Sequence, residues 1–161
     1  MPIWIALVLG LLASPPLATL TSARSTGEAL WFSSPALGVK GTIAPISGSR
    51  FEIVVITLGD EPVEVELRQF ALITSDKSVH EPIAAGASAD LIFPVDSIPL
   101  GREVGQILPS DAMVSLKRTT FATVMLEADA HATVALVFQV PERLEARALK
   151  LPGGAELVVT K

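Results

Sequence analysis

Cysteine, asparagine and tyrosine are all absent from this chain of 161 residues. Without cysteine the chain forms no disulfide, and it has neither a thiolate metal site nor a cysteine nucleophile. Without asparagine it has no N-x-S/T acceptor for glycosylation. Aromatic residues make up only 5% of the chain. Sugar binding that relies on tyrosine stacking or on asparagine amides is therefore disfavoured.

Positive charge is also scarce, since 12 basic residues stand against 17 acidic ones and give a net charge of −5. Nucleic-acid affinity comes largely from clustered lysine and arginine side chains. The small basic clusters, Lys117-Arg118 and Arg143 with Arg147 and Lys150, stand among many acids and are typical of solvated surfaces. We therefore expect no nucleic-acid partner.

The first 23 residues carry no charged side chain. Ile3–Leu12 is an apolar run that matches the core of a secretory signal and is too short for the ~20 residues that span a bilayer. Pro15 and Pro16 then end any helix. Thr21-Ser22-Ala23 supplies the small residues of a cleavage site that would leave Arg24 as the new N-terminus.

This pattern predicts a signal helix within residues 1–23 and an exported protein, which is secreted, periplasmic or at the cell surface. After cleavage we expect no membrane insertion. The second interpretation is an uncleaved N-terminal membrane anchor. Residues 24–35 are mostly small and polar and predict a lead-in linker, which leaves 36–161 as a single domain.

The domain has the composition of an all-β protein. Arg50–Leu58 is β-branched and nearly continuously apolar, which favours a central strand covered on both faces. Val63–Gln69 alternates valine and leucine with glutamate and arginine, which predicts a strand with one dry and one wet face. Turns are predicted at Gly59–Pro62 and at Ser75–Ser78.

The later segments are less uniform. Ile83–Ser110 is rich in proline and glycine and predicts a long loop. Phe121–Leu126 and Ala132–Val140 are predicted to form a long hairpin. Pro141–Leu149 predicts one helical turn, and a second hairpin follows with the strands Ala146–Leu151 and Glu156–Thr160. About seven to nine short antiparallel strands favour an immunoglobulin-like β-sandwich.

Two stretches, Arg50–Pro82 and His131–Leu151, carry a resemblance that covers about a third of the chain. Their motifs are Glu61-Pro62-Val63-Glu64-Val65, Phe70-Ala71-Leu72 and Val137-Phe138-Gln139-Val140-Pro141. They resemble a widespread family of exported bacterial domains of unknown function, akin to the mycobacterial immunoprotective extracellular antigen. The resemblance implies an immunoglobulin-like sandwich, export and a role in the cell envelope. It implies no catalytic residue.

Motifs for catalysis are missing as well. His80 and His131 are the only imidazoles, and neither stands in a G-x-S-x-G, H-E-x-x-H or phosphate-loop motif. Asp60-Glu61 belongs to a turn, and Glu64 and Glu66 alternate with valines on a wet strand face rather than facing each other across a cleft. The sequence therefore predicts neither an enzyme nor a bound cofactor.

One alternative is a soft-metal site. His80, Met113, Met125 and His131 are side chains that bind Cu(I) when a fold brings them together. Against this, methionines within apolar strands usually fill gaps in a core. The sequence thus favours an exported, non-enzymatic binding or structural module of the cell envelope or extracellular space, with a protein or envelope partner. An exported copper carrier is the alternative.

Overall fold

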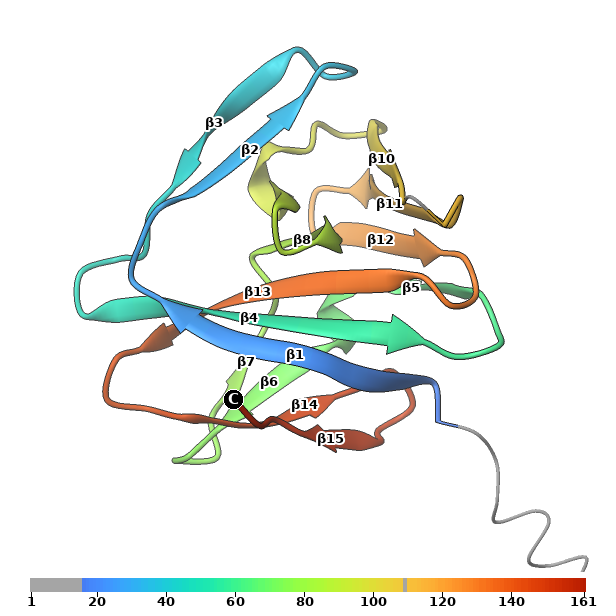
Figure 1. The fold of residues 1–161 in the computed structure, drawn as a ribbon. Coiled ribbons are helices and arrows are strands. Elements are labelled where there is room, and N and C mark those ends of the chain that lie inside the picture. The colour runs from blue at the N-terminus through green and yellow to red at the C-terminus, as the bar shows by residue number, and fades with distance from the viewer. Residues whose placement is uncertain (1–15, 109) are drawn as a thin grey trace, which may run out of the picture.

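The computed structural model describes residues 16–108 and 110–161, and this part of the chain is all-β (Figure 1). The all-β prediction is thereby confirmed. The strands are β1 (Ala18–Thr26), β2 (Leu30–Ser34), β3 (Val39–Ile43), β4 (Ser49–Leu58), β5 (Val63–Glu66), β6 (Ala71–Thr74), β7 (Val79–His80), β8 (Ala84–Ser88), β9 (Leu91–Pro94), β10 (Glu103–Ile107), β11 (Met113–Thr120), β12 (Thr123–Ala128), β13 (Thr133–Pro141), β14 (Ala146–Lys150) and β15 (Glu156–Val158). Two short 3-10 helices are η1 (Leu67–Gln69) and η2 (Val95–Ser97).

The strands form antiparallel sheets. A five-stranded sheet has the order β1-β4-β13-β8-β9, and two four-stranded sheets have the orders β10-β11-β12-β5 and β15-β14-β6-β7. A hairpin, β2-β3, forms a separate sheet that is not hydrogen-bonded to the others (Figure 1). The order places β4 and β13 side by side in the interior of the largest sheet, and they pair from Thr57↔Thr133 to Ser49↔Pro141.

Strand β4 is buried on both faces, as its composition predicts. Val54 and Ile56 belong to the main core, which also receives buried side chains from both four-stranded sheets. Ile53 and Val55 point to the other face and belong to a smaller core. Leu30 of the β2–β3 hairpin packs against that smaller core. The hairpin therefore covers part of the outer face of the large sheet.

Strand β5 begins with the predicted alternation, while Val65 and Glu66 are both half-buried. Val63 is buried and Glu64 is exposed. Leu67 is buried too, but it lies in η1 rather than in a continued strand. The wet face of this strand lies on the outer side of the sheet β10-β11-β12-β5, away from the main core.

The predicted long loop at residues 83–110 is wrong, since it contains β8, β9, η2 and β10. The reason lies in Gly86. A Cβ on this residue would lie 1.7 Å from the carbonyl oxygen of Leu91, so β8 and β9 approach closely only because glycine is there. Strands of small residues such as Ala84–Ser88 show no hydrophobic alternation, and hydrophobic periodicity therefore misses them.

The predicted long hairpin of β12 and β13 is also wrong. β12 pairs with β11 and β5, whereas β13 pairs with β4 and β8 in a different sheet. The chain changes sheets in the turn between them, where His131 has a φ of 63°. Two strands adjacent in sequence therefore share the core without sharing hydrogen bonds.

The predicted helical turn within Pro141–Leu149 is not formed. Pro141 is the last residue of β13, and a turn follows in which the Leu144 N–H donates to the Pro141 carbonyl at 3.0 Å. Strand β14 begins at Ala146 and pairs with β15, with Leu149 opposite Leu157. The second predicted hairpin is thereby confirmed, and pairing of its first arm with β15 and β6 overrides local helix propensity.

The N-terminal assignments need a correction. Residues 24–35, predicted as a linker, contain the last three residues of β1 and all of β2. β1 also crosses the predicted cleavage point at Ala23, because Ala18 lies opposite Leu58 and is 1% exposed. The predicted signal-helix core, Ile3–Leu12, lies outside the described residues. Among residues 16–108 and 110–161, no helix is long and apolar enough to cross a membrane.

The Gly86 contact generates a first prediction. Gly86→Ala should lower the free energy of unfolding by roughly 1–3 kcal/mol or more, because the methyl group overlaps a backbone carbonyl that cannot rotate away. Urea denaturation measures the change. Gly27→Ala is the control, since a Cβ there meets nothing within 4 Å. Equal stability of the two variants would show that β8 and β9 separate without penalty.

Candidate functional site

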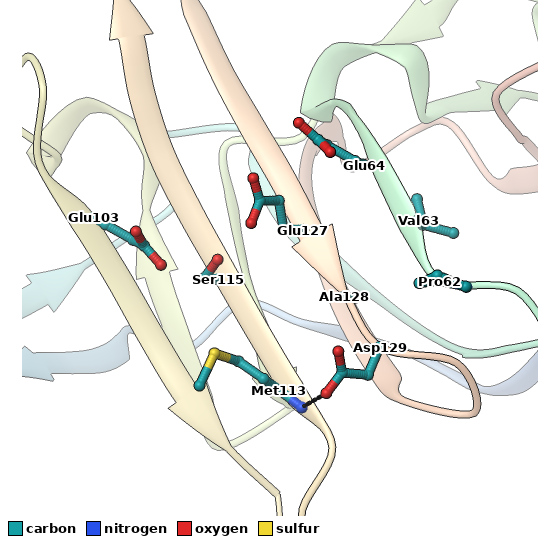
Figure 2. A pocket seen from close by; sticks show the side chains of 9 residues that line it. All are labelled: Pro62, Val63, Glu64, Glu103, Met113, Ser115, Glu127, Ala128 and Asp129. Carbon is teal, nitrogen blue, oxygen red and sulfur yellow. Dashed lines mark hydrogen bonds between the residues drawn. The ribbon is translucent and has the colours of Figure 1, made fainter.

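A hollow of about 370 Å³ lies on the outer face of the sheet β10-β11-β12-β5 (Figure 2). We call it the acidic hollow. Its volume falls within the range of small-molecule sites. It is lined by Pro62, Val63, Glu64, Glu103, Met113, Ser115, Glu127, Ala128 and Asp129.

Strand register explains why the surface is hollow at this place. Gly105, Ser115, Glu127 and Glu64 lie opposite one another in one row across the four strands. Gly105 and Ser115 are small, so the surface is low over β10 and β11. The longer side chains of Glu127 and Glu64 rise beside it on β12 and β5. The neighbouring residues of each strand, such as Leu116 and Leu126, point into the main core.

The charge of the acidic hollow is uncompensated. Four carboxylates line it and no lysine or arginine does. Glu64 and Glu127 are direct cross-strand partners, an arrangement that destabilises a sheet when both are ionised. Lys117 lies opposite Glu103, but the two form no ion pair within the described residues.

The hydroxyl of Ser115 opens into the acidic hollow. The residue is only 3% exposed, but its Oγ is not a buried atom without a partner, since among the described residues that description fits only Glu52 Oε2. Figure 2 shows this hydroxyl between the carboxylates of Glu103 and Glu127. The hydroxyl therefore adds one polar group to the acidic hollow, beside its negative charge.

One end of the acidic hollow is held in place by a side chain. Asp129 Oδ2 accepts a hydrogen bond from the backbone N–H of Met113 at 2.8 Å. The Asp129 N–H in turn donates to the Met113 carbonyl at 3.0 Å. This pair of bonds continues the β11–β12 ladder by one residue and fixes the Asp129 carboxylate beside the Met113 backbone nitrogen (Figure 2).

The four residues of the predicted soft-metal site lie on separate elements. His80 lies in β7 and His131 in the turn after β12, where its Nε2 is 3.3 Å from Asp60 Oδ1. Met113 and Met125 share the outer face of β11 and β12. Met125 lies opposite Lys117, however, which is two residues beyond Ser115 along β11. Within the described residues, no three histidine, aspartate or glutamate side chains are arranged to hold a metal ion.

A histidine, a serine and an aspartate do meet in the β6–β7 hairpin. The Ser78 hydroxyl donates to Asp76 Oδ1 at 2.5 Å and lies 3.0 Å from His80 Nε2. An activated nucleophile needs its base to accept the hydroxyl proton. Here the proton is directed to Asp76, a weak base. The arrangement therefore stabilises the turn, in which Lys77 has a φ of 67°.

The same contacts change the acidity of Asp76. The Ser78 hydroxyl contributes most, followed by the Ser78 backbone N–H and the Thr74 hydroxyl, and together they lower the pKa of Asp76 from 3.8 to about 2. Each of these groups donates a hydrogen bond to the ionised carboxylate and so favours the charged form. Arg143 adds a smaller electrostatic lowering.

A buried ion cluster lies at the end of the main core. Glu52 is fully buried, and its Oε1 accepts hydrogen bonds from Ser25 Oγ at 2.7 Å, Arg50 Nε at 2.9 Å and Lys161 Nζ at 2.8 Å. Arg50 also donates to the carbonyls of Glu142 and Leu144. All these contacts lie within the protein, so the cluster joins β1, β4 and the β13–β14 turn and serves the fold.

A second cavity, of about 460 Å³, lies beneath the β2–β3 hairpin. Its walls include the exposed Trp31 and Leu91, and its rim carries Lys40 and Asp90, one charge of each sign. Phe32 closes its inner side by packing edge-on against Phe93, with ring centroids 5.4 Å apart. Trp31, Phe32, Leu91 and Ile92 make its lining largely apolar, and the two opposite charges of Lys40 and Asp90 leave it without net charge.

The acidic hollow is not evident in the sequence. Glu64 is recognisable as an outward-facing residue of an alternating strand. Glu103 lies in the segment predicted as a loop, and Glu127 in the predicted hairpin of β12 and β13. Only the pairing of β12 with β5 brings Glu127 opposite Glu64. The one local signal is a small residue at an outward position of β11, where Ser115 stands between Met113 and Lys117.

Comparison with known proteins gives no further assignment. No protein-family model, no curated protein and no solved structure matches this chain. The function is therefore argued from the geometry of the protein itself.

The Asp76 contacts generate a second prediction. Ser78→Ala should raise the pKa of Asp76 from about 2 toward 3.8, because it removes the largest of the favourable hydrogen bonds. Carboxylate chemical shifts followed by NMR against pH measure this. In the wild type, ionised Asp76 stabilises the fold above pH 3.8, and that contribution is lost as pH falls toward about 2. An unchanged pKa in Ser78→Ala would contradict the assignment.

The opposed glutamates generate a third prediction. Glu127→Gln should raise the free energy of unfolding by about 0.2–1 kcal/mol, because it removes like-charge repulsion with Glu64. The gain should shrink in high salt, which screens exposed charges. Urea denaturation at two salt concentrations measures it. Glu156→Gln is the contrast, since Glu156 lies opposite Lys150 and its neutralisation should not stabilise the protein.

Proposed function

We propose that this protein is an exported, non-enzymatic binding module that holds a positively charged organic ligand in the acidic hollow. Its fold is proposed to be an immunoglobulin-like β-sandwich. The layered antiparallel sheets around one main core support that proposal, as does the sequence resemblance. Export rests on the apolar segment Ile3–Leu12.

The observation that carries the proposal is the uncompensated charge of the acidic hollow. Four carboxylates and the Ser115 hydroxyl line it, and no lysine or arginine is among the lining residues. A ligand with N–H donors would satisfy the hydroxyl and the carboxylates together, since ionised acceptors form the stronger hydrogen bonds. Repulsion between Glu64 and Glu127 would then be relieved only in the complex. Sites that lower stability in the free protein in this way are common where function requires them.

A binding role without catalysis also fits the chemistry of the acidic hollow. Its reactive groups are carboxylates and one serine hydroxyl, and neither histidine lines it. A serine without a base is a weak nucleophile. The copper-carrier alternative gains no support from the separate positions of His80, Met113, Met125 and His131.

Thermal unfolding with added ligands provides the test and a fourth prediction. Organic cations should raise the Tm of the full chain, by roughly 5–10 °C at a concentration near 100 Kd, whereas matched neutral and anionic compounds should not. The double variant Glu64→Gln/Glu127→Gln should lose this response. A shift of the same size in the double variant, or none with any organic cation, would refute the proposed site.

Export is tested separately by intact mass and fractionation of the protein from its own host. An extracytoplasmic protein shortened at its N-terminus would support the proposal. A full-length cytoplasmic protein would refute export while leaving the ligand test valid. The mass also reports whether Ala18–Ala23, which form the first two thirds of β1, are retained.

A further inference from the structure

We infer that the cavity beneath the β2–β3 hairpin is a docking site for an extended peptide of alternating apolar and acidic residues, which pairs with the free edge of β2. The inference is independent of the acidic hollow. The cavity of about 460 Å³ adjoins a smaller one of about 180 Å³, and both are lined by Trp31, Asp90 and Ile92. We call the two together the hairpin groove.

The hairpin groove follows the edges of two strands. Side chains of consecutive residues point to opposite faces of a strand. The larger cavity is lined by the consecutive residues 31–33 of β2 and by the consecutive residues 91–92 of β9. It therefore runs along the edges of these two strands instead of over one face of either.

Neither edge has a strand partner among the described residues. β2 pairs only with β3 (Figure 1), and β9, at the end of its sheet, pairs only with β8. A peptide adds to a sheet through main-chain hydrogen bonds at such an open edge. β9 ends at Pro94, which has no N–H to donate, so β2 offers the more complete set of main-chain groups. These open edges favour a peptide over a ligand without a backbone.

The faces of the β2–β3 hairpin indicate which side chains the peptide carries. Ser33 lies opposite Lys40, so Lys40 shares one face of the hairpin with Trp31. Phe32 points to the other face, toward the main core. A strand added beside β2 has the same alternation, so every second side chain lies next to Phe32 and the others lie on the face of Trp31 and Lys40. Apolar residues suit the first set, and acidic residues suit the second.

The charges of the hairpin groove also favour acidic side chains. Lys40 lines the larger cavity, Arg24 lines the smaller one, and Asp90 lines both. None of the three forms an ion pair within the described residues. The groove therefore has more positive than negative groups in a chain whose net charge is −5. An acidic peptide is attracted to this place, whereas the acidic hollow repels it.

Trp31 is the side chain expected to contribute most to binding. The residue is 78% exposed although it borders an apolar cavity, and Leu91 in the same lining is 48% exposed. Tryptophan is among the residues that most often dominate the energy of protein interfaces. Phe121 lies in the turn between β11 and β12, is 87% exposed and lines neither cavity. It is therefore the matched control for loss of an exposed aromatic side chain.

The experiment is NMR titration of the full chain with blocked heptapeptides, and it gives a fifth prediction. A peptide of alternating glutamate and valine should shift the backbone amide signals of β2 and the indole N–H signal of Trp31. Trp31→Ala should weaken binding about tenfold or more, and Phe121→Ala should leave it unchanged. Lys40→Glu should weaken it roughly two- to fivefold, as expected for an exposed ion pair, and should strengthen binding of a lysine–valine heptapeptide. Circular dichroism of every variant verifies that the fold is retained.

An N-methylated analogue of the glutamate–valine peptide separates strand pairing from apolar contact, since it lacks main-chain N–H donors. It should not bind. Equal binding of the analogue, unchanged binding by Trp31→Ala, or shifts confined to β5 or β10 would overturn the inference. Absence of any shift at millimolar peptide would overturn it too. The same shifts on raising the protein concentration without peptide would assign the hairpin groove to a second copy and so contradict it.

Discussion

The pairing of β4 with β13 is the interaction on which the other elements depend. Both strands are apolar on both faces, so hydrophobicity alone specifies their register weakly. Glu52 helps to specify the register of β4. Its carboxylate meets Arg50, Ser25 and Lys161 at the end of the main core. A slip by one residue would turn this charge into the smaller apolar cluster without a partner, where it would be strongly destabilising.

The two faces of the sheet β10-β11-β12-β5 differ, since one packs on the main core and the other carries the acidic hollow. Val104, Val114, Leu116 and Leu126 complete the main core. The residues between them are free of packing constraints and carry glutamates, a serine and a glycine in one row. The repulsion between Glu64 and Glu127 therefore lies on the face that does not pack on the main core. Mutation of the acidic hollow is expected to affect the proposed ligand binding more than folding, which suits a site placed on a stable framework.

Much of the fold follows from the sequence, and the residues explain which parts. β4 is recognisable because a strand buried on both faces is continuously apolar. β5 is recognisable because a strand buried on one face alternates apolar and polar residues. The turn at Ser75–Ser78 and the β14–β15 hairpin follow from turn chemistry. β8 is missed because its alanines carry no periodic signal, and its position depends on the contact that Gly86 permits. The acidic hollow is missed because it needs the pairing of β12 with β5, which no local pattern encodes.

The pairing of β4 with β13 also has a consequence for how the chain folds. The partners Val54 and Leu136 lie roughly half the chain apart, so the central pair closes only after most of the sequence is available. Folding dominated by such non-local contacts is slow, on the order of milliseconds to seconds. During that interval Ile53–Thr57 is an exposed, uncharged run of β-branched residues, the kind of segment that pairs with other copies of itself. The yield of folded protein during synthesis thus depends on how long β4 stays unpaired before β13 is available, as well as on the stability of the folded protein.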